Sequence, residues 1–555
     1  MRDGDARTHI VVIGGGQAAK WLLMGLAERL ARGERRLGDL EITVLERSWE
    51  FATGLAWSRH NALPEHQTSL AEPISRVCFG DEQRQQFQEV VDLIRRQGIA
   101  VDLRRGIEAI DLARRADGAL QIKTSEGVEL HADAVVLATG HWRAPDPLSG
   151  SRGFLASPWP ARDLQDAICD IRPGASGSSR REVLILGTYL DAIDTVISLA
   201  SKVGEFSRTG ARWQFRGPRD FHMTMASRRG QLPRVWGRAP ITRPTRFLTA
   251  DVLESRRSSG FLPLAHCLNS LQREIAGAGV DVPSLHSLLG ARRRSREQSR
   301  AGDTTRAVRR RLESDIYAVF APGEASGRYE DTHEVAWQAA LFAALPILSE
   351  HSHAWSAEDQ QWFDRKLRMT FFRHAMPMTL ASALMLRALM EAGNLSIMAL
   401  GSGYECVPTP SGFSVMSHHD ERPIARFTHG VRAYATSSDI RRHPAPLIQG
   451  ALRAGLVRPA ARAFREAGSA ELIATTGGAA ALLVRNEQPY LVTGGVEVNP
   501  RTREVIGDDA CSRTSRRGLL FAMGPLLIGQ FLDAHSLGQL IRDSTAILSR
   551  LADVR

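Results

Sequence analysis

Cysteine is scarce in this sequence, and its spacing excludes several kinds of site. The chain has five cysteines in 555 residues, and no two of them form a CxxC pair. Disulfide-stapled domains, zinc sites and redox-active dithiols need numerous or closely spaced cysteines. The sequence therefore predicts no disulfide framework, no metal site and a reducing, cytoplasmic location.

Long apolar runs are also missing. The N-terminus is charged and polar as far as His9, which is not the pattern of a secretory signal peptide. A membrane-spanning helix needs a run of about 18 apolar residues. The two closest candidates fall short, because 376–386 ends at Arg387 and 518–532 is interrupted by Gly524-Pro525. We expect no membrane span and no membrane partner.

Aromatic residues are few, at 6%, although the net charge is +10. The arginine runs at 292–294 and 309–311 carry no interleaved aromatic residues, which single-stranded nucleic-acid binders use for stacking. Such runs are more often a solvated helix face. We therefore expect no nucleic-acid partner, while the excess positive charge remains compatible with small anionic ligands.

A dinucleotide-binding turn stands at the start of the chain. Gly14, Gly16 and Ala19 form a G-x-G-x-x-A pattern between a buried strand (9–13) and an amphipathic helix (20–31). The first glycine allows a tight turn, the second lets the backbone approach a pyrophosphate, and the small third residue lets helix and strand pack closely. The anion would sit on N–H groups at the helix N-terminus.

An acidic residue follows this turn at the position that binds a ribose. Glu46 ends the next strand (40–45) and is placed to accept hydrogen bonds from ribose hydroxyls. The alternative is a glycine-rich turn with a solvent-facing glutamate. The residues predicted to contact the cofactor here are Gly14, Gly16, Gln17, Ala18, Glu46 and Arg47.

Two further segments are expected near the same cofactor. The strand at 133–137 ends in Ala138-Thr139-Gly140, small residues that let the sheet backbone crowd a ligand. The loop 54–69 follows the strand of Glu46, so Trp57, His66 and Gln67 are candidates to pack on the cofactor or to donate to it. For Trp57 and His66 the alternative is a plain core position.

A second strand-turn-helix unit begins at residue 183. Gly187 and Thr188 open its turn, but Tyr189 stands where a second glycine is usual. A later strand (221–225) runs into Ser227-Arg228-Arg229, where arginine forks suit the 2′-phosphate of NADPH and no acid favours NADH. The alternative is a degenerate second fold that binds nothing.

Two short segments that contain histidine are candidates for catalysis or for metal binding. Arg373 and His374 stand beside a proline turn between two apolar helices, where they could bind a carboxylate and tune proton transfer. We predict them as catalytic residues, and the alternative is a helix-capping arginine with a structural histidine. His418 and His419 suggest a metal pair, but adjacent residues of a strand point to opposite faces, which favours a surface loop.

Together these segments resemble the flavoproteins with two dinucleotide-binding domains, and among them the flavin-dependent N-hydroxylating monooxygenases. The layout also looks like that of the biosynthetic nitrosuccinate synthases, which oxidise the amine of aspartate. The resemblance implies FAD in the N-terminal site and NADPH in the second. It also implies that Gly524 and Pro525 cover the pyrimidine edge of the flavin, with the N-terminus of the final helix stabilising negative charge. The segments that carry it are 10–19, 54–57, 138–142, 227–234 and 521–525.

The resemblance further implies an FAD-dependent, NADPH-consuming monooxygenase. Its reduced flavin would trap oxygen as a hydroperoxide, and a small polar amine or amino acid would attack the distal oxygen and be N-hydroxylated. The partners are then a small-molecule substrate and molecular oxygen, and a homo-oligomer is left open. The alternatives are a flavin-dependent NADPH oxidase or reductase without oxygen insertion, and a nonenzymatic scaffold on a relic flavoprotein fold.

The length exceeds what one hydrophobic core supports, so several domains are expected. The β-α-β order of both units predicts an α/β fold with two Rossmann-like dinucleotide-binding domains, each with a parallel sheet, and a helical, arginine-rich insertion. A Gly/Ser/Pro/Arg-rich linker is expected at 172–180. The expected boundaries are 1–172 for the first part of the FAD-binding domain, 178–257 for the NADPH-binding domain, 258–393 for the insertion with the substrate region, and 394–555 for the return to the FAD-binding domain.

Overall fold

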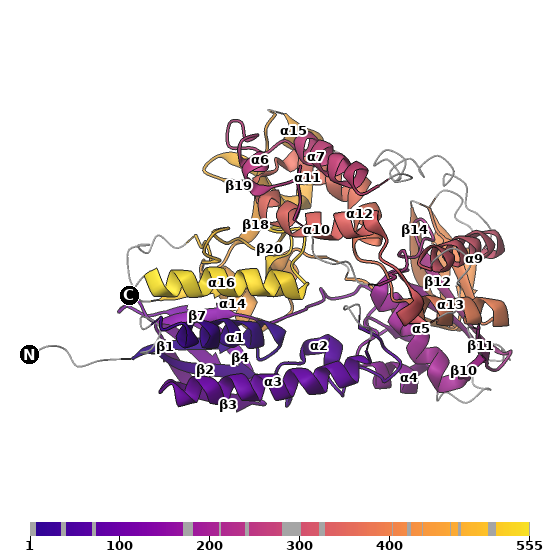
Figure 1. Ribbon diagram of the computed structural model, residues 1–555, viewed down its shortest axis with the longest axis horizontal. Coiled ribbons are helices and arrows are strands. Elements are labelled where there is room, and N and C mark those ends of the chain that lie inside the picture. The colour runs from indigo at the N-terminus through magenta and orange to yellow at the C-terminus, as the bar shows by residue number, and fades with distance from the viewer. Residues whose placement is uncertain are drawn as a thin grey trace, which may run out of the picture.

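The structure is a computed structural model. It describes residues 7–34, 40–68, 74–169, 181–209, 212–238, 244–279, 301–320, 328–401, 403–418, 423–435, 437–466, 468–475, 479–508 and 518–553. Figure 1 shows three regions: a first sheet with long helices on the left, a second sheet on the right, and a mainly helical region above. The expected linker at 172–180, the run 292–294, Cys511 and His419 lie outside the described residues.

The first sheet has five parallel strands in the order β21-β7-β1-β2-β3. Ile10 and Val12 of β1 pack under α1, α3 and α16, whereas Val11 and Ile13 pack on the opposite face against β4-β5-β6 and α14. Parallel strands buried on both faces need such unbroken apolar runs. The elements of this unit are β1 (Thr8–Ile13), α1 (Gln17–Ala31), β2 (Leu40–Glu46), α2 (Gly54–Trp57), α3 (Arg76–Arg96), β3 (Ala100–Arg105), β4 (Ala109–Arg114), β5 (Leu120–Thr124), β6 (Glu129–Ala132), β7 (Ala134–Leu137), α14 (Pro446–Arg453), β21 (Leu519–Ala522) and α16 (Leu537–Asp553).

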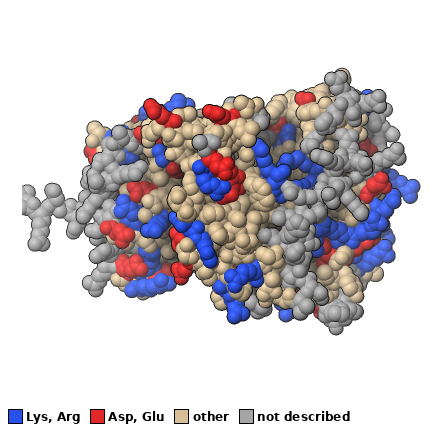
Figure 2. Space-filling model, turned by 90° about the horizontal axis from the view of Figure 1, so that it is seen from above, with Lys and Arg blue, Asp and Glu red and all other residues tan. Residues whose placement is uncertain are grey.

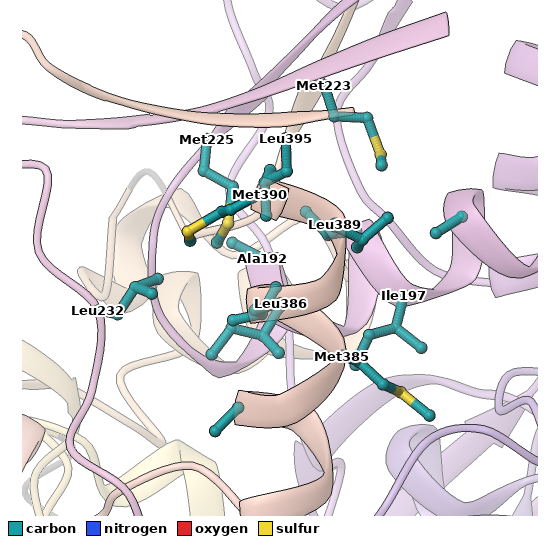
Figure 3. Packing of buried hydrophobic residues seen from close by; sticks show 14 of the residues in the cluster. Ala192, Ile197, Met223, Met225, Leu232, Met385, Leu386, Leu389, Met390 and Leu395 are labelled. Carbon is teal, nitrogen blue, oxygen red and sulfur yellow. The ribbon is translucent and has the colours of Figure 1, made fainter. Parts of the chain in front are cut away.

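The second sheet also has five parallel strands, in the order β13-β12-β9-β17-β8. Figure 3 shows buried side chains of α13 between β12 and α5, with Met390 near Met225 and Met385 near Ile197. A small antiparallel sheet, β14-β15-β16, covers the other face. The elements are β8 (Phe154–Leu155), α4 (Ala161–Cys169), β9 (Arg181–Leu186), α5 (Leu190–Val203), β10 (Glu205–Thr209), β11 (Arg212–Arg216), β12 (Phe221–Ser227), α9 (Ala301–Ala318), α13 (Leu380–Ala392), β13 (Leu395–Ala399), β14 (Tyr404–Thr409), β15 (Gly412–Ser417), β16 (Pro423–Phe427) and β17 (His429–Arg432).

The predicted α/β class with two parallel, Rossmann-like sheets is confirmed. The second sheet, however, takes strands from both sides of the expected range 178–257: β8 precedes it, and β13 and β17 lie beyond residue 394. Parallel neighbours need long crossover connections, and the helical insertion lies within the crossover from β12 to β13. The second unit is therefore assembled from three separate stretches of chain.

The helical region has its own apolar core, formed by α7, α10 and α12 with Trp355 and Leu532. The three-stranded sheet β18-β20-β19 adjoins it. The elements are α6 (Ala250–Glu254), α7 (Leu264–Gly277), η2 (Tyr329–Asp331), α10 (Ala336–His351), η3 (Ser352–Ala354), α11 (Ala357–Trp362), η4 (Phe363–Leu367), α12 (Arg368–Ala375), η5 (Ile440–Arg442), β18 (Pro459–Ala463), α15 (Ser469–Ile473), η7 (Ala479–Ala481), β19 (Leu482–Arg485), β20 (Gln488–Val496) and η8 (Gly524–Leu527).

Basic side chains form several separate groups on the face seen in Figure 2, among acidic and uncharged ones. Among the described residues, no helix has the length and apolarity that crossing a bilayer requires. Within the same ranges, no three His, Cys, Asp or Glu side chains gather as they would around a metal ion.

Candidate cofactor-binding sites

The first glycine turn joins β1 to α1 and is built from backbone. Gly14 has a φ of +110°, and a Cβ there would lie 2.2 Å from the carbonyl oxygen of Ala138, so only glycine fits. Gly16 is the N-cap of α1, and a Cβ there would face Gly54 Cα at 3.5 Å. The N–H groups of a first helical turn have no intrahelical partner. The turn therefore fits a pyrophosphate held by main-chain donors.

Glu46 ends β2 beside this turn. One carboxylate oxygen accepts from the Gly15 N–H at 2.8 Å and the other accepts from the Ser48 N–H at 2.7 Å. These bonds fix the carboxylate next to the turn, while each oxygen keeps a lone pair for another donor. The geometry is compatible with the predicted ribose contact. Arg47, the next predicted residue, is exposed.

Gln17 and Ala18 are both buried, so their side chains support the turn from within. Gln17 Nε2 donates to the Ala52 carbonyl and, at 3.3 Å, to Gln83 Oε1. A bound anion would thus meet the backbone N–H groups of these two residues and not their side chains.

The loop after Glu46 reaches across to the second unit. Trp57 ends α2 and meets Phe79 of α3 edge to face, with ring centroids 5.1 Å apart. The carbonyl of Gln67 accepts from Arg76 Nε at 3.1 Å, and Arg76 pairs with Asp194 of α5 at 2.7 Å. The Trp57 ring thus packs on α3, and the Gln67 backbone is linked to α5 through Arg76. Contact of either side chain with a flavin remains a prediction.

The turn after β7 lies against the glycine turn. The carbonyl of Ala138 crowds Gly14, and Gly140 has a φ of +72°. The Thr139 hydroxyl is buried without a hydrogen-bond partner among the described residues. Buried hydroxyls are normally hydrogen-bonded, so this one suits a polar atom of a bound cofactor.

Gly524 and Pro525 form the start of the short 3-10 helix η8, and the final helix does not follow them directly. The Gly524 N–H donates to Asp543 Oδ2 at 3.1 Å, and α16 begins only at Leu537. Gly524-Pro525 thus precedes the final helix as expected, with η8 and a loop between them, and its contact with a flavin stays a prediction. The Gly524 N–H also already has an acceptor within the protein.

The second glycine turn differs from the first because side chains of the turn make hydrogen bonds to neighbouring segments. Gly187 has a φ of +130°, and the Thr188 hydroxyl lies 3.0 Å from Ser227 Oγ and 2.8 Å from the Gln231 carbonyl. The Tyr189 hydroxyl lies 3.0 Å from the carbonyl of Phe372 and 2.8 Å from that of Met376. The tyrosine that replaces the second glycine thus ties the turn to the segment after α12.

Arg228 and Arg229 follow β12 and are both exposed, as a site for a nucleotide phosphate requires. Arg229 Nη1 donates to the Thr370 hydroxyl at 3.3 Å. Ser227 Oγ accepts from the Gly230 N–H at 3.1 Å, which holds the loop in a tight turn. The arginines stand at the carboxyl end of β12, the parallel strand that follows β9 in the sheet, where a 2′-phosphate binds in Rossmann folds.

A cavity of about 260 Å³ adjoins this loop. It is lined by residues 229–233, one face of α9, Arg373 and Ala399. Arg373 is buried and donates to the Leu232 carbonyl at 2.7 Å and to Gln231 Oε1. Burial and the neighbouring arginines lower its pKa to about 9.

His374 does not line that cavity. It is buried beside Trp337, and its Nδ1 lies 2.7 Å from the Thr370 carbonyl, to which it donates. Burial lowers the pKa of His374 to about 3, so the ring is neutral near pH 7. Arg373 lines the cavity and His374 does not, and their catalytic role stays a prediction.

His141 and His535 lie where the first unit faces the second. Their rings are stacked, with centroids 4.8 Å apart and planes 8° apart. Both side chains are exposed, yet the surrounding protein lowers the pKa of His141 and lowers that of His535 to about 3.

Arg143 connects the first unit to α5 of the second unit. Its Nη2 lies 3.0 Å from Asp191 Oδ2, in the first turn of α5 directly after the second glycine turn. Burial raises the pKa of Asp191, and Arg143 opposes that rise. The sequence did not predict His141, His535, Arg143 and Asp191 as site residues. His141 directly follows Ala138-Thr139-Gly140, which is a local signal, whereas His535 carries none.

Comparison with known proteins adds a family match to the first unit. Residues 65–142 match a family described as FAD-NAD(P)-binding, which indicates FAD and NAD(P) as the cofactors of this type of chain. The uncharacterized protein YdhS of Escherichia coli (strain K12) is 25% identical over 346 residues, or 60% of this chain and 60% of that protein. The match thus spans about three fifths of the length of this curated relative.

Solved structures of similar fold include three bacterial enzymes. Ornithine hydroxylase (PvdA) from Pseudomonas aeruginosa is 12% identical, with 99% of both chains covered and a TM-score of 0.42. L-lysine 6-monooxygenase from Pseudomonas syringae is 11% identical, with 98% and 99% covered and a TM-score of 0.43. Bacillithiol disulfide reductase Bdr (YpdA) from Bacillus cereus is 9% identical, with 99% of both chains covered and a TM-score of 0.40.

Proposed function

We propose that this chain is an FAD-dependent, NADPH-consuming monooxygenase that N-hydroxylates a small polar amine or amino acid. The observation that carries the flavin part is the turn at Gly14–Gly16, which is lined by backbone and flanked by the carboxylate of Glu46. The buried, unpartnered hydroxyl of Thr139 beside it fits a bound cofactor. When bound, FAD would accept a hydride from NADPH and pass electrons to oxygen.

The preference for NADPH is supported by the difference between the two units. The first ends its second strand in an acid, Glu46, which suits free ribose hydroxyls, whereas the second ends β12 in Ser227-Arg228-Arg229. An arginine pair suits a phosphate and an acid repels it. The second site would thus take the phosphorylated nucleotide.

The histidine pair is compatible with proton handling in such a reaction. His141 and His535 are both exposed and their rings are stacked. A neutral imidazole has one donor and one acceptor nitrogen, so this pair would hold or move a proton at its ring nitrogens. Asp191 and Arg143 stand beside them and would orient a polar substrate.

Two other functions compete with this proposal. A flavin-dependent NADPH oxidase or reductase would consume NADPH and yield hydrogen peroxide or a reduced acceptor without hydroxylated product. A nonenzymatic scaffold on a relic flavoprotein fold would be colourless after purification and remain so when FAD is added. A screen of amines and amino acids for oxygen uptake, with products identified by mass spectrometry, separates the three.

The cofactor assignment is tested by the double variant Arg228→Ala, Arg229→Ala. Hydrogen bonds to charged groups contribute about 1.5–3 kcal/mol each. Both arginines are exposed, so we expect the pair together to contribute about as much as one such bond. The KM for NADPH should then rise about tenfold to about 150-fold, with little change for NADH. Steady-state kinetics with both nucleotides measure this ratio.

The matched control replaces two exposed arginines elsewhere, Arg256→Ala and Arg453→Ala. It removes the same net charge and should leave the NADPH-to-NADH ratio unchanged. If the Arg228/Arg229 variant binds FAD and keeps the wild-type ratio, the second site does not read the 2′-phosphate as proposed.

A further inference from the structure

The cavity beside the Arg228-Arg229 loop carries an excess of positive charge. Two carboxylates line it, and each is matched by an arginine that does not: Asp315 pairs with Arg234 at 2.8 Å, and Asp303 lies 3.9 Å from Arg306. Three arginines line the cavity as well, which are Arg229, Arg311 and Arg373. The lining therefore holds one more positive than negative charge, although Asp315 also attracts Arg311 and Arg373.

Arg311 is the clearest of these charges. It is half-buried on α9 and lines the cavity. Its charge acts on Asp315 one turn along the helix, but no close ion pair or hydrogen bond holds it among the described residues. Its neighbours in the sequence run differ, since Arg310 is exposed and Arg309 lies 3.5 Å from Glu313. The run at 309–311 was expected to be a solvated helix face, and the helical turn directs Arg311 inward instead.

Thr304 supplies a second, independent observation. It is 8% exposed, lines the same cavity, and its hydroxyl has no hydrogen-bond partner among the described residues. Thr304 and Arg311 are seven residues apart on α9, which places them on one face of the helix. A buried hydroxyl without a partner is costly unless a ligand atom satisfies it.

Arg373 completes the wall from α12. Its guanidinium makes two hydrogen bonds, to the Leu232 carbonyl and to Gln231 Oε1, and has five N–H groups to offer. Its three remaining N–H groups have no partner among the described residues. Burial and the positive charges around it lower its pKa, which a bound anion would reverse.

The cavity lies at the carboxyl ends of β12 and β13, where ligands bind in open α/β sheets. At about 260 Å³ it is smaller than most ligand pockets, which span about 300–1,000 Å³. It can therefore enclose a phosphate group with part of a sugar, and the rest of a larger ligand would lie outside it.

We propose that this cavity binds a dianionic phosphate monoester, with Arg311 and Thr304 of α9 and Arg373 of α12 as its ligands. The insertion that separates β12 from β13 thus contributes the phosphate site of the second unit. The assignment of the phosphate to the ribose of NADPH rests on the proposed function, whereas the phosphate site itself does not.

Isothermal titration calorimetry on the full-length protein tests the site with three probes: 2′-AMP, 5′-AMP and inorganic phosphate, at low ionic strength and one pH. We expect 2′-AMP to bind more tightly than 5′-AMP. Arg311→Gln should weaken 2′-AMP binding about tenfold or more, and Thr304→Val about threefold to tenfold, because each removes donors from a charged acceptor. Arg310→Gln, on the exposed side of the same helix, is the control and should leave binding unchanged.

The outcomes separate the sources of the phosphate. Equal binding of 2′-AMP and inorganic phosphate, both weakened by Arg311→Gln, supports the phosphate site and assigns it to a free phosphate group. Absence of binding by all three probes, or binding that neither variant changes while circular dichroism shows both folded, overturns the proposal. A protein that takes up no FAD or oxidises no NADPH overturns the proposed function alone, since calorimetry of the phosphate site needs neither.

Discussion

His66 is expected to link the stability of this protein to pH. Its imidazole is completely buried between the first unit and α5. Nδ1 accepts from the Leu63 N–H at 3.2 Å, and Nε2 donates to Ser198 Oγ at 2.8 Å, because that hydroxyl donates in turn to the Asp194 carbonyl. The neutral ring satisfies both nitrogens, whereas a proton on Nδ1 would face another N–H. Burial and the charge of Arg76 lower the pKa of His66 to about 3.

The size of the effect follows from the difference between folded and unfolded pKa. The unfolded chain takes up a proton near pH 6.5, and the folded chain takes it up only near pH 3. The contribution of His66 is therefore complete above pH 6.5 and is lost as the pH falls from 6.5 toward 3. At about 1.4 kcal/mol per unit, His66 alone should cost about 2 kcal/mol of stability between pH 7.5 and pH 5.0.

Urea unfolding of the wild type and of His66→Gln at both pH values measures this loss. We expect the wild type to lose about 2 kcal/mol more than the variant between pH 7.5 and pH 5.0. Trp159, whose ring centroid lies 5.5 Å from that of His66, makes fluorescence a suitable signal. His60→Gln, an exposed position in the same loop, controls for the loss of a histidine. Equal pH dependence in the wild type and His66→Gln would refute the reasoning.

The two glycine turns give further expectations. Gly14→Ala should prevent FAD uptake and lower the melting temperature, because the added Cβ would lie 2.2 Å from the Ala138 carbonyl oxygen. The flavin absorbance of the purified variant measures FAD uptake, and a normal flavin content would contradict this expectation. Tyr189→Phe removes the hydroxyl that donates to the carbonyls of Phe372 and Met376, so we expect a loss of about 1 kcal/mol in urea unfolding. An unchanged midpoint would mean that the turn does not depend on that contact.

The sequence predicted the sheets well because their signals are local. The apolar strands around Val12 and Ile185 are buried on both faces, and unbroken apolar runs of that length are typical of parallel strands. The strained turns were also visible, since Gly14 and Gly187 both adopt a positive φ that other residues avoid. Each of these features depends on a few neighbouring residues.

Features that join distant segments escaped prediction. His141 and His535 are almost 400 positions apart in the printed sequence, and only the folded chain stacks their rings. The same applies to the extent of the second unit, where β13 and β17 return to a sheet that the chain had left. Spacing along the sequence carries no record of such neighbours.

The sequence by itself therefore determined the α/β class, the two nucleotide-binding turns and the arginine pair after β12, because each is a short-range pattern of apolar, glycine or charged residues. Only the tertiary structure decided what surrounds them. Arg311 was expected on a solvated helix face and instead lines a cavity. His374 is buried and does not line the cavity that Arg373 lines, and the Tyr189 hydroxyl contacts the Met376 carbonyl after α12. The physical reason is that burial and charge compensation depend on side chains from separate elements, which meet only when the chain has folded.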